Sequence, residues 1–333
     1  VLIARNGEVG HLAAYGKMGM DRDDPMRTDA LFRIYSMTKP ITTAVALMLY
    51  EEGAFALDNP VGEWLPELRH LRLLDGSLLA RDITVRDLMC HTAGFTNSFG
   101  RDPLATHYRK EKVSNGSLDA LVDVLGRLPL LHQPGERFSY GLSTNVIGAL
   151  IEKISGLSLD AYLLKNIFEP LGMKDTYFYL PKNKKDRLVK LYAKNTDTSL
   201  ALVPPALFNA DYPLQKNSTY FSAIGGLVST THDYAKFLSC LLDRGELSNG
   251  SQLLSKSMID SLTTNQLGAK TFIFGGFPSL NTFGLGVGLT STKGQVVNNA
   301  SEGSYFWGGA FNTAYMVDPK RKLITLFFGI IAD

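Results

Sequence analysis

Cysteine and tryptophan are scarce in this sequence, and neither sign of charge prevails. The two cysteines, Cys90 and Cys240, lie far apart in the 333 residues and form no Cys-x-x-Cys or similar metal-binding spacing. We therefore expect buried thiols rather than a disulfide framework or a cysteine-based metal site. The net charge is only +2, with 34 basic and 32 acidic side chains spread along the chain. Because no basic stripe is available for a phosphate backbone, nucleic acid is not an expected partner.

Long apolar runs are absent too. No segment reaches the roughly 20 apolar residues that a membrane-spanning helix needs. The chain opens on VLIARNGEVG, which lacks the basic and apolar regions of a secretory leader. The chain as it stands is therefore expected to be cytoplasmic, and a periplasmic or secreted location stays open if the natural protein begins earlier.

The short motifs of many known enzymes are missing as well. There is no G-x-S-x-G turn, no H-E-x-x-H pair and no Walker-type loop, and we expect neither a metal ion nor a cofactor. The six histidines are scattered, and His91 and His232, which sit beside turn or cap residues, are expected to be structural.

Both ends of the chain have β-strand patterns. At the start, two apolar runs flank Asn6-Gly7, a dipeptide typical of type I′ hairpin turns. At the end, residues 313–317 and 323–331 are rich in β-formers and flank the turn dipeptide Asp318-Pro319. We expect these terminal strands to lie in one antiparallel sheet.

The middle of the chain has helical patterns instead. Helices are predicted to begin at Thr84 and to span residues 143–154, 158–168 and 231–242, with Gly156 ending the second and Pro170 with Gly172 ending the third. Residues 97–117 and 181–220 are predicted as long loops at the rim of a cleft. The predicted fold is α+β, with a sheet lobe of residues 1–55 and 216–333, a mainly helical lobe of residues 56–215, and the active site between them.

The stretch FRIYSMTKPITTAVALMLYEEG places Ser36 three residues before Lys39 at the start of an apolar run. Pro40 is tolerated only in the first turn of a helix, so a helix begins near Ser36, and Gly53 ends it. In one interpretation Ser36 caps this helix and Lys39 is solvated. In the other, Ser36 is a nucleophile whose proton a desolvated Lys39 takes or steers. A lysine in the first turn opposes the helix dipole, which weakens the first interpretation. The pair alone leaves both open.

Two further stretches carry a family resemblance. They are QPGERFSYGLSTNVIGALIEKISG, residues 133–156, and YFWGGAFNTAYMVDPKRKL, residues 305–323. Together with SMTKP, and in the same order, they resemble motifs of the serine β-lactamase and penicillin-binding protein superfamily. The closest likeness is to the class C β-lactamase-like esterases, also called family VIII carboxylesterases, and it extends over nearly the whole chain. The resemblance implies a β-lactamase/transpeptidase-like fold with an antiparallel sheet flanked by helices.

The same resemblance assigns roles to individual residues. Ser36 matches the family nucleophile, Lys39 its paired lysine and Tyr140 the tyrosine of the second motif. Trp307-Gly308-Gly309 matches the third motif, which commonly reads W-x-G in the esterases. Ala310 matches the residue whose backbone N–H joins that of Ser36 in an oxyanion hole.

The departures from the family pattern bear on the substrate. Leu142 stands where lactamases have an asparagine, and Trp307 stands where a lysine helps to bind a carboxylate. A site without these polar groups loses charge-assisted hydrogen bonds to an anionic lactam or peptide, while Trp307 and Phe306 add apolar area. We therefore predict Leu142, Phe306, Trp307 and the two glycines as substrate-binding residues for neutral esters.

The predicted function is hydrolysis of small or short-chain carboxylic esters through an acyl-enzyme on Ser36. Lys39 and Tyr140 together take the serine proton, and Tyr140 needs the nearby lysine cation if it is to act as a phenolate base. One alternative is a D-alanyl-D-alanine carboxypeptidase or weak class C-type β-lactamase. A second is a non-catalytic scaffold with the penicillin-binding fold. The sequence leaves the oligomeric state and the natural substrate open.

Overall fold

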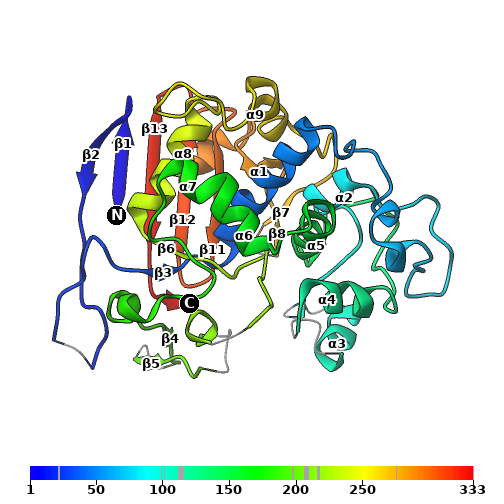
Figure 1. The fold of residues 1–333 in the computed structure, drawn as a ribbon, viewed down its shortest axis with the longest axis horizontal. Helices are drawn as coiled ribbons and strands as arrows, with labels where there is room; N and C mark the ends of the chain where they lie inside the picture. The colour runs from blue at the N-terminus through cyan, green and yellow to red at the C-terminus, as the bar shows by residue number, and fades with distance from the viewer. Residues whose placement is uncertain are drawn as a thin grey trace.

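Both ends of the chain enter one antiparallel sheet in the computed structural model (Figure 1). The structure describes residues 1–332 apart from residues 22, 99, 101, 112–115, 197–198, 206–209, 216–217 and 275. The sheet has seven strands in the order β2-β1-β13-β12-β11-β10-β9. Its strands are β1 Leu2–Arg5, β2 Glu8–Leu12, β9 Thr282–Phe283, β10 Gly288–Leu289, β11 Tyr305–Gly309, β12 Thr313–Asp318 and β13 Leu323–Phe328.

The predicted pairing of the two chain ends is confirmed. The first strand, β1, pairs with β13 in antiparallel register, with Leu2 opposite Leu326. The hairpin turn between β1 and β2 has positive φ at both Asn6 and Gly7, as a type I′ turn requires. The predicted α+β fold class is therefore correct.

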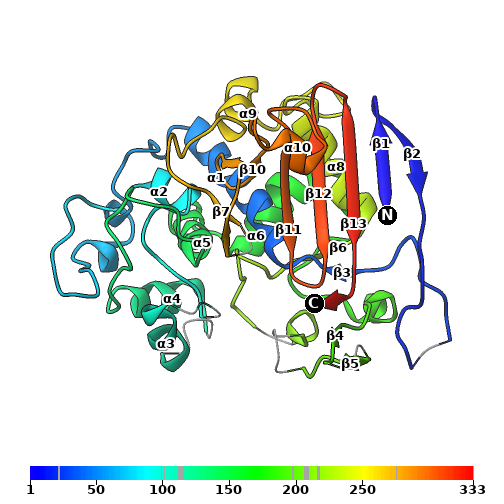
Figure 2. The same ribbon diagram turned by 180° about the vertical axis from the view of Figure 1, so that it is seen from behind.

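Helix α8, Thr231–Leu242, lies across one face of this sheet and packs against β13 and β1 (Figure 1). Helix α1, Thr38–Glu51, lies beside the sheet and packs against α5. Alternate side chains of β13, such as Ile324 and Leu326, are buried on this side, as expected for a strand with one covered face. Figure 2 shows β11, β12 and β13 from the other side, with the short helix α10 Gln295–Asn298 near their upper ends.

A group of helices lies beside the sheet, at the right of Figure 1. Its central member is α5, which packs against α1, α2, α4 and α6. The helices of the middle of the chain are α2 Val85–Met89, α3 Pro103–Lys110, α4 Leu118–Leu125, α5 Ser143–Ser155, α6 Leu159–Leu163 and α7 Glu169–Leu171. A π-helical turn, η4 Leu164–Phe168, joins α6 to α7, and α9 Lys256–Leu262 lies near the upper edge of the sheet in both views.

Shorter elements connect these parts. The 3-10 turns are η1 Tyr35–Met37, η2 Val61–Glu63, η3 Pro66–Leu68, η5 Lys182–Arg187 and η7 Tyr212–Leu214. The remaining strands are β3 Phe32–Arg33, β4 Tyr192–Lys194, β5 Leu200–Leu202, β6 Val228–Ser229, β7 Ile273–Phe274, β8 Phe277–Pro278 and β14 Ile331–Ala332.

A small second sheet, in the order β14-β4-β5, brings the end of the chain beside residues 192–202 (Figure 1). Strand β14 pairs with β4 in parallel register. This pairing attaches part of the predicted helical lobe to the sheet lobe. The exact division into residues 1–55 with 216–333 and residues 56–215 stays a prediction.

Most helix predictions hold, and two need correction. Helices α5 and α8 fall where the periodicity places them, and Gly156 ends α5 with a φ of +69°. The predicted helix 158–168 instead runs on through the π-helical turn η4 and α7 to Leu171, and Gly172 ends it with a φ of +62°. The predicted loop 97–117 contains α3, which Asp102 caps through its side chain.

Helix α2 leads into the segment that supports the candidate site, and Asp87 fixes its start. The Asp87 carboxylate is 5% exposed and accepts hydrogen bonds from Arg81, from the backbone and hydroxyl groups of Thr84 and from the hydroxyl group of Thr92. The Thr84 hydroxyl group accepts in turn from the Asp87 backbone N–H, which completes a capping box.

We predict that Asp87→Ala lowers the free energy of unfolding by about 2–4 kcal/mol, because it removes the cap and strands a buried Thr92 hydroxyl group. Urea denaturation measures the loss. The matched control is Asp58→Ala, which removes the ion pair between Asp58 and Arg86. The Asp58 carboxylate is 75% exposed, so we expect the free energy of unfolding to change by less than about 1 kcal/mol. Equal losses in the two variants would contradict the account of Asp87.

Candidate active site

Ser36 lies in the tight turn η1, which directly precedes helix α1. Helix α1 begins at Thr38, and the residue before it, Met37, makes no capping hydrogen bond through its side chain. Ser36 therefore does not cap the helix, and that structural interpretation of the serine does not hold. Pro40 falls in the first turn of α1, as the sequence predicts.

Lys39 is the buried neighbour of Ser36. Its Nζ atom lies 3.1 Å from Ser36 Oγ and donates a 2.7 Å hydrogen bond to the backbone carbonyl of Ile224. The residue is 3% exposed, and among the described residues it has no carboxylate within ion-pair distance. Burial lowers the pKa of Lys39 well below its ordinary value of 10.5. A neutral amine with a free lone pair can accept a proton from the serine.

Tyr140, in the loop before α5, is the third polar residue beside Ser36 and Lys39. The Lys39 Nζ atom lies 4.6 Å from the centre of its ring. The Tyr140 hydroxyl group is buried and makes no well-formed hydrogen bond to the described residues. Burial raises the pKa of Tyr140 well above its usual range, and the nearby side chains of Ser36 and Trp307 lower it by less. The phenol is therefore protonated at neutral pH.

The loop that carries Tyr140 rests on residues 95–97. A Cβ atom at Gly141 would lie 2.4 Å from the carbonyl oxygen of Thr96, so only glycine allows this close approach. The Thr96 carbonyl accepts a hydrogen bond from the Leu142 N–H, and the Asn97 side chain donates one of 3.0 Å to the Tyr140 carbonyl. The sequence analysis missed Asn97, and no local pattern marks it.

Asn145 supports the lysine from the other side. Its Oδ1 atom accepts a 3.1 Å hydrogen bond from the Ile224 N–H, and its Nδ2 atom donates to the Tyr220 hydroxyl group. The carbonyl group of the same residue, Ile224, accepts the hydrogen bond from Lys39 Nζ. Asn145 thus fixes the backbone segment that orients Lys39. An asparagine within the apolar stretch of α5 is a sequence signal that could have identified it, because a buried amide needs hydrogen-bond partners, and Asn145 is indeed fully buried.

His91 packs against the ring of Tyr140. The two ring centres are 4.8 Å apart, and His91 also contacts Phe138 and Phe283. Burial is the main cause that lowers the pKa of His91, to about 3. The neutral ring fills space beside the tyrosine, in agreement with its predicted structural role.

Strand β11 forms the opposite wall. It packs against η1, and a Cβ atom at Gly309 would lie 2.3 Å from the carbonyl oxygen of Ile34. Glycine at this position lets the strand approach the turn that carries Ser36. Ala310 follows directly at the exposed end of β11.

Ser36 lies between two cavities. The larger, of about 810 Å³, is lined by Ser36, Tyr140, Trp307, Gly308 and Gly309 among others. The smaller, of about 370 Å³, is lined by Ser36, Lys39, Tyr140 and Ala310 among others. The structure therefore brings seven of the nine predicted site residues to the walls of these two cavities.

Two predicted substrate-binding residues do not lie there. Leu142 is 2% exposed, and its side chain belongs to the hydrophobic core because its backbone begins α5. Phe306 points to the opposite side of β11 from Trp307, against Gly288 on β10. Neither residue is among those that line the two cavities, so both predictions are corrected.

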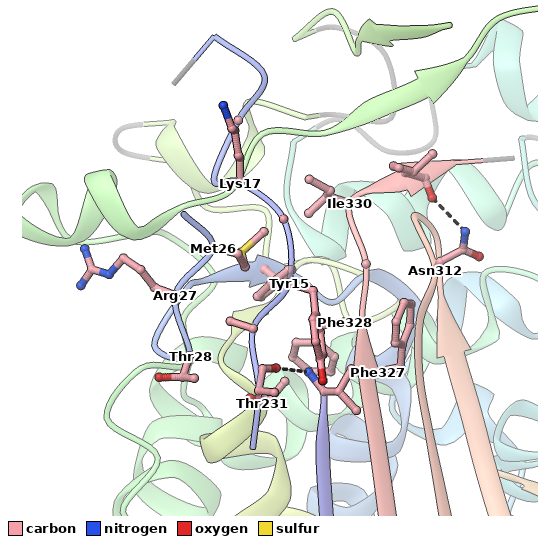
Figure 3. Close-up of a pocket in the computed structure, with 18 of the residues that line it drawn as sticks. Tyr15, Lys17, Met26, Arg27, Thr28, Thr231, Asn312, Phe327, Phe328 and Ile330 are labelled. Atoms are coloured by element: carbon pink, nitrogen blue, oxygen red, sulfur yellow. Dashed lines mark hydrogen bonds between the residues drawn. The ribbon is translucent and has the colours of Figure 1, made fainter. Parts of the chain in front are cut away.

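A third cavity, of about 510 Å³, lies near the β14 end of the sheet (Figure 3). It shares Asn312 and Phe327 with the larger cavity of Ser36. Its walls are mostly apolar, with Lys17 and Arg27 at its border. Within the described residues, no three His, Cys, Asp or Glu side chains gather to hold a metal ion. No described helix is long and apolar enough to cross a membrane.

A family model described as Beta-lactamase matches residues 1–328. The chain belongs to this family. The resemblance drawn from the three motifs is thereby confirmed, and the family consists of serine hydrolases with the β-lactamase fold.

Individual relatives agree with this assignment. Esterase EstB of Burkholderia gladioli is 36% identical over 183 residues, which cover 53% of this chain and 46% of that protein. Monacolin J acid methylbutanoyltransferase of Aspergillus terreus is 28% identical over 358 residues, which cover 98% of this chain and 85% of that protein. The solved structure of EstCE1, described as a hydrolase with promiscuous acyltransferase activity, shares the fold, with a TM-score of 0.84 over 99% of this chain and 88% of that chain at 23% identity.

The lowered pKa of Lys39 predicts a pH-dependent stability. Between the folded-state pKa of Lys39 and 10.5, the unfolded chain binds one more proton than the folded chain, so the free energy of unfolding rises with pH by about 1.4 kcal/mol per unit. Lys39→Met removes this contribution. We therefore expect the difference in free energy of unfolding, wild type minus Lys39→Met, to increase with pH by this slope between the folded-state pKa of Lys39 and 10.5. Urea denaturation between about pH 7.5 and 9.5 tests it. Parallel curves would show a protonated lysine in the folded protein.

Proposed function

We propose that this protein is a serine carboxylesterase that acts through an acyl-enzyme on Ser36. The observation that carries the proposal is the buried Lys39 amine at 3.1 Å from Ser36 Oγ, with no described carboxylate to hold it as a cation. A nucleophile and a base within hydrogen-bond reach are what covalent catalysis by serine needs.

In the first step, the proton of the Ser36 hydroxyl group passes to Lys39 Nζ while Oγ bonds to the ester carbonyl carbon. The resulting oxyanion accepts hydrogen bonds from the backbone N–H groups of Ser36 and Ala310. One such donor is typically worth about 3–4 kcal/mol in the transition state. The two residues line the smaller cavity together, which supports this assignment.

The tetrahedral intermediate then collapses. The bond between carbon and the leaving oxygen breaks, Tyr140 gives its phenolic proton to the alcohol, and the Lys39 ammonium group returns a proton to Tyr140. In the second step, water loses a proton to Lys39, attacks the acyl carbon and releases the acid, and Ser36 regains its proton. Lys39 is the base here, because burial disfavours both the lysine cation and the tyrosine phenolate. The proposal thus assigns the role of base to Lys39 alone, where the sequence-based scheme gave a share of it to Tyr140.

Neutral esters fit the larger cavity better than anionic lactams or peptides. Its described lining residues include the carboxylate of Asp102 and neither lysine nor arginine. Trp307 adds an apolar wall in place of the family lysine. An anionic substrate would lose hydration there without gaining a charged partner. EstB, the esterase that is 36% identical over half of this chain, supports the same choice.

Transfer of the acyl group to a second alcohol is the other candidate. The relative named as a methylbutanoyltransferase aligns with 98% of this chain, and the larger cavity has space for an acceptor in the size range of organic ligands. Hydrolysis and transfer share the acyl-enzyme and differ only in whether water or an alcohol attacks it.

We predict that the protein hydrolyses short-chain p-nitrophenyl esters and that a serine-reactive phosphonate labels Ser36, as located by peptide mass spectrometry. Ser36→Ala should abolish labelling and lower kcat/KM by at least about a thousandfold. Ser143→Ala is the matched control, because this buried serine begins α5, lines neither cavity and has no hydrogen bond from its hydroxyl group to the residues that the structure describes. It should retain activity and labelling.

Three results would contradict the proposal. An unlabelled Ser36 or an active Ser36→Ala variant excludes this serine. A folded protein that neither hydrolyses esters nor reacts with the phosphonate is a scaffold. Faster hydrolysis of a chromogenic cephalosporin than of any ester would favour the lactamase alternative.

A further inference from the structure

Two aromatic residues beside the candidate oxyanion hole have unusual backbone geometry. Tyr35 has a φ of +42° and Phe311 a φ of +63°. Bulky side chains rarely adopt this left-handed region, because it is sterically strained for a residue with a Cβ atom. A folded protein keeps them only where surrounding contacts hold them in place.

The positions of these residues in the chain are specific. Tyr35 immediately precedes Ser36, and Phe311 immediately follows Ala310. Each strained aromatic is therefore covalently joined to one of the two proposed oxyanion donors. The two rings stack on each other, with centres 5.4 Å apart and planes inclined by 24°. The stack connects the turn that carries Ser36 to the turn between β11 and β12.

The Phe311 side of this stack is anchored in the small second sheet. Phe311 is 2% exposed and packs in a cluster with Leu191, Val203 and Ala210, while Tyr35 lies at the edge of the same cluster. Leu191 directly precedes β4, and Val203 directly follows β5. The aromatic pair thus transmits the position of the second sheet to the oxyanion hole.

The next residue fixes the same turn to β14. The Asn312 side chain donates a 3.0 Å hydrogen bond to the carbonyl group of Ile331, as the dashed line in Figure 3 shows. The Asn312 carbonyl accepts a second one, also of 3.0 Å, from the Gly329 N–H. On the other side, Gly309 lies against Ile34. The turn is therefore held by contacts of Gly309, Phe311 and Asn312, and the aromatic stack of Phe311 is the middle contact.

We propose that Phe311 is a positioning residue of the catalytic site, which sets the separation of the Ser36 and Ala310 N–H groups by stacking on Tyr35. This inference rests on the proposed serine mechanism and names the part of the fold that maintains its oxyanion hole. Misplacement of a catalytic group by about 1 Å costs as much as a hundredfold in rate, so loss of the stack should act on kcat. Phe311 lines none of the three cavities, so KM should change little.

The test compares variants on both sides of the stack. Phe311→Leu should lower kcat for a p-nitrophenyl ester by about tenfold to a hundredfold, with KM within about twofold. Phe311→Gly relieves the strained backbone but removes the ring, and it should lose as much. Phe311→Tyr keeps both rings and should retain kcat. A kcat maintained in Phe311→Gly would show that the backbone angle matters and the stack does not.

Two further measurements separate positioning from general stability. A trifluoromethyl ketone, whose adduct on Ser36 places an oxyanion in the hole, should bind Phe311→Leu more weakly by the same factor as kcat falls. Phe55→Leu is the matched control, because Phe55 is 5% exposed and pairs edge-to-face with Trp64 outside the cavities. It should lose stability with kcat unchanged.

The double variant Tyr35→Leu/Phe311→Leu completes a double-mutant cycle, which measures the coupling between the two rings. Because both changes break one contact, the double loss in kcat should not exceed the larger single loss. If Phe311→Leu does not fold, Tyr35→Leu tests the same contact. Multiplicative losses, or an unchanged kcat in folded Phe311→Leu, would overturn the inference. Wild-type labelling at Ser36 distinguishes this failure from that of the proposed function, in which the wild type itself is unlabelled.

Discussion

The burial of one amine against one hydroxyl group, Lys39 Nζ beside Ser36 Oγ, is the interaction on which this site depends. An ammonium group there would give up its hydration without a described carboxylate in return, so the folded protein favours the neutral amine. The same desolvation makes Lys39 a base for the serine and lowers the stability of the fold at neutral pH. Function and stability are therefore opposed at this residue, which also explains a lysine at the positive end of a helix.

Three distant parts of the chain converge to maintain that contact. The turn of Ser36 comes from the N-terminal part, the loop of Tyr140 and the carbonyl group of Ile224 from the middle, and β11 from the C-terminal part. Glycine makes the approaches possible, since a side chain at Gly141 or Gly309 would meet a backbone carbonyl oxygen within 2.5 Å. The pairing of β1 with β13 matters for the site because it joins the two chain ends from which the serine and β11 derive.

Sequence reasoning succeeds where a local residue type has one physical use. Asn6-Gly7 predicts its hairpin, and Gly156 predicts the end of α5, because each occupies a backbone region that other residues disfavour. It fails where the outcome depends on tertiary packing. Leu142 and Phe306 sit next to site residues in the sequence, yet side-chain direction places both away from the cavities. The partnership of Tyr35 with Phe311 spans most of the chain and has no local sign at all.

The pH dependence of Ser36 phosphonylation tests the central claim about Lys39 most directly, since it follows the attack of the serine without substrate release. If the neutral amine is the base, the second-order rate constant rises with pH and reaches half its maximum well below 10.5, the ordinary lysine pKa. In Lys39→Met, this rise with pH should disappear, and the rate constant itself should fall close to zero. A wild-type midpoint at or above 10.5, or an unchanged profile in the variant, would contradict the account.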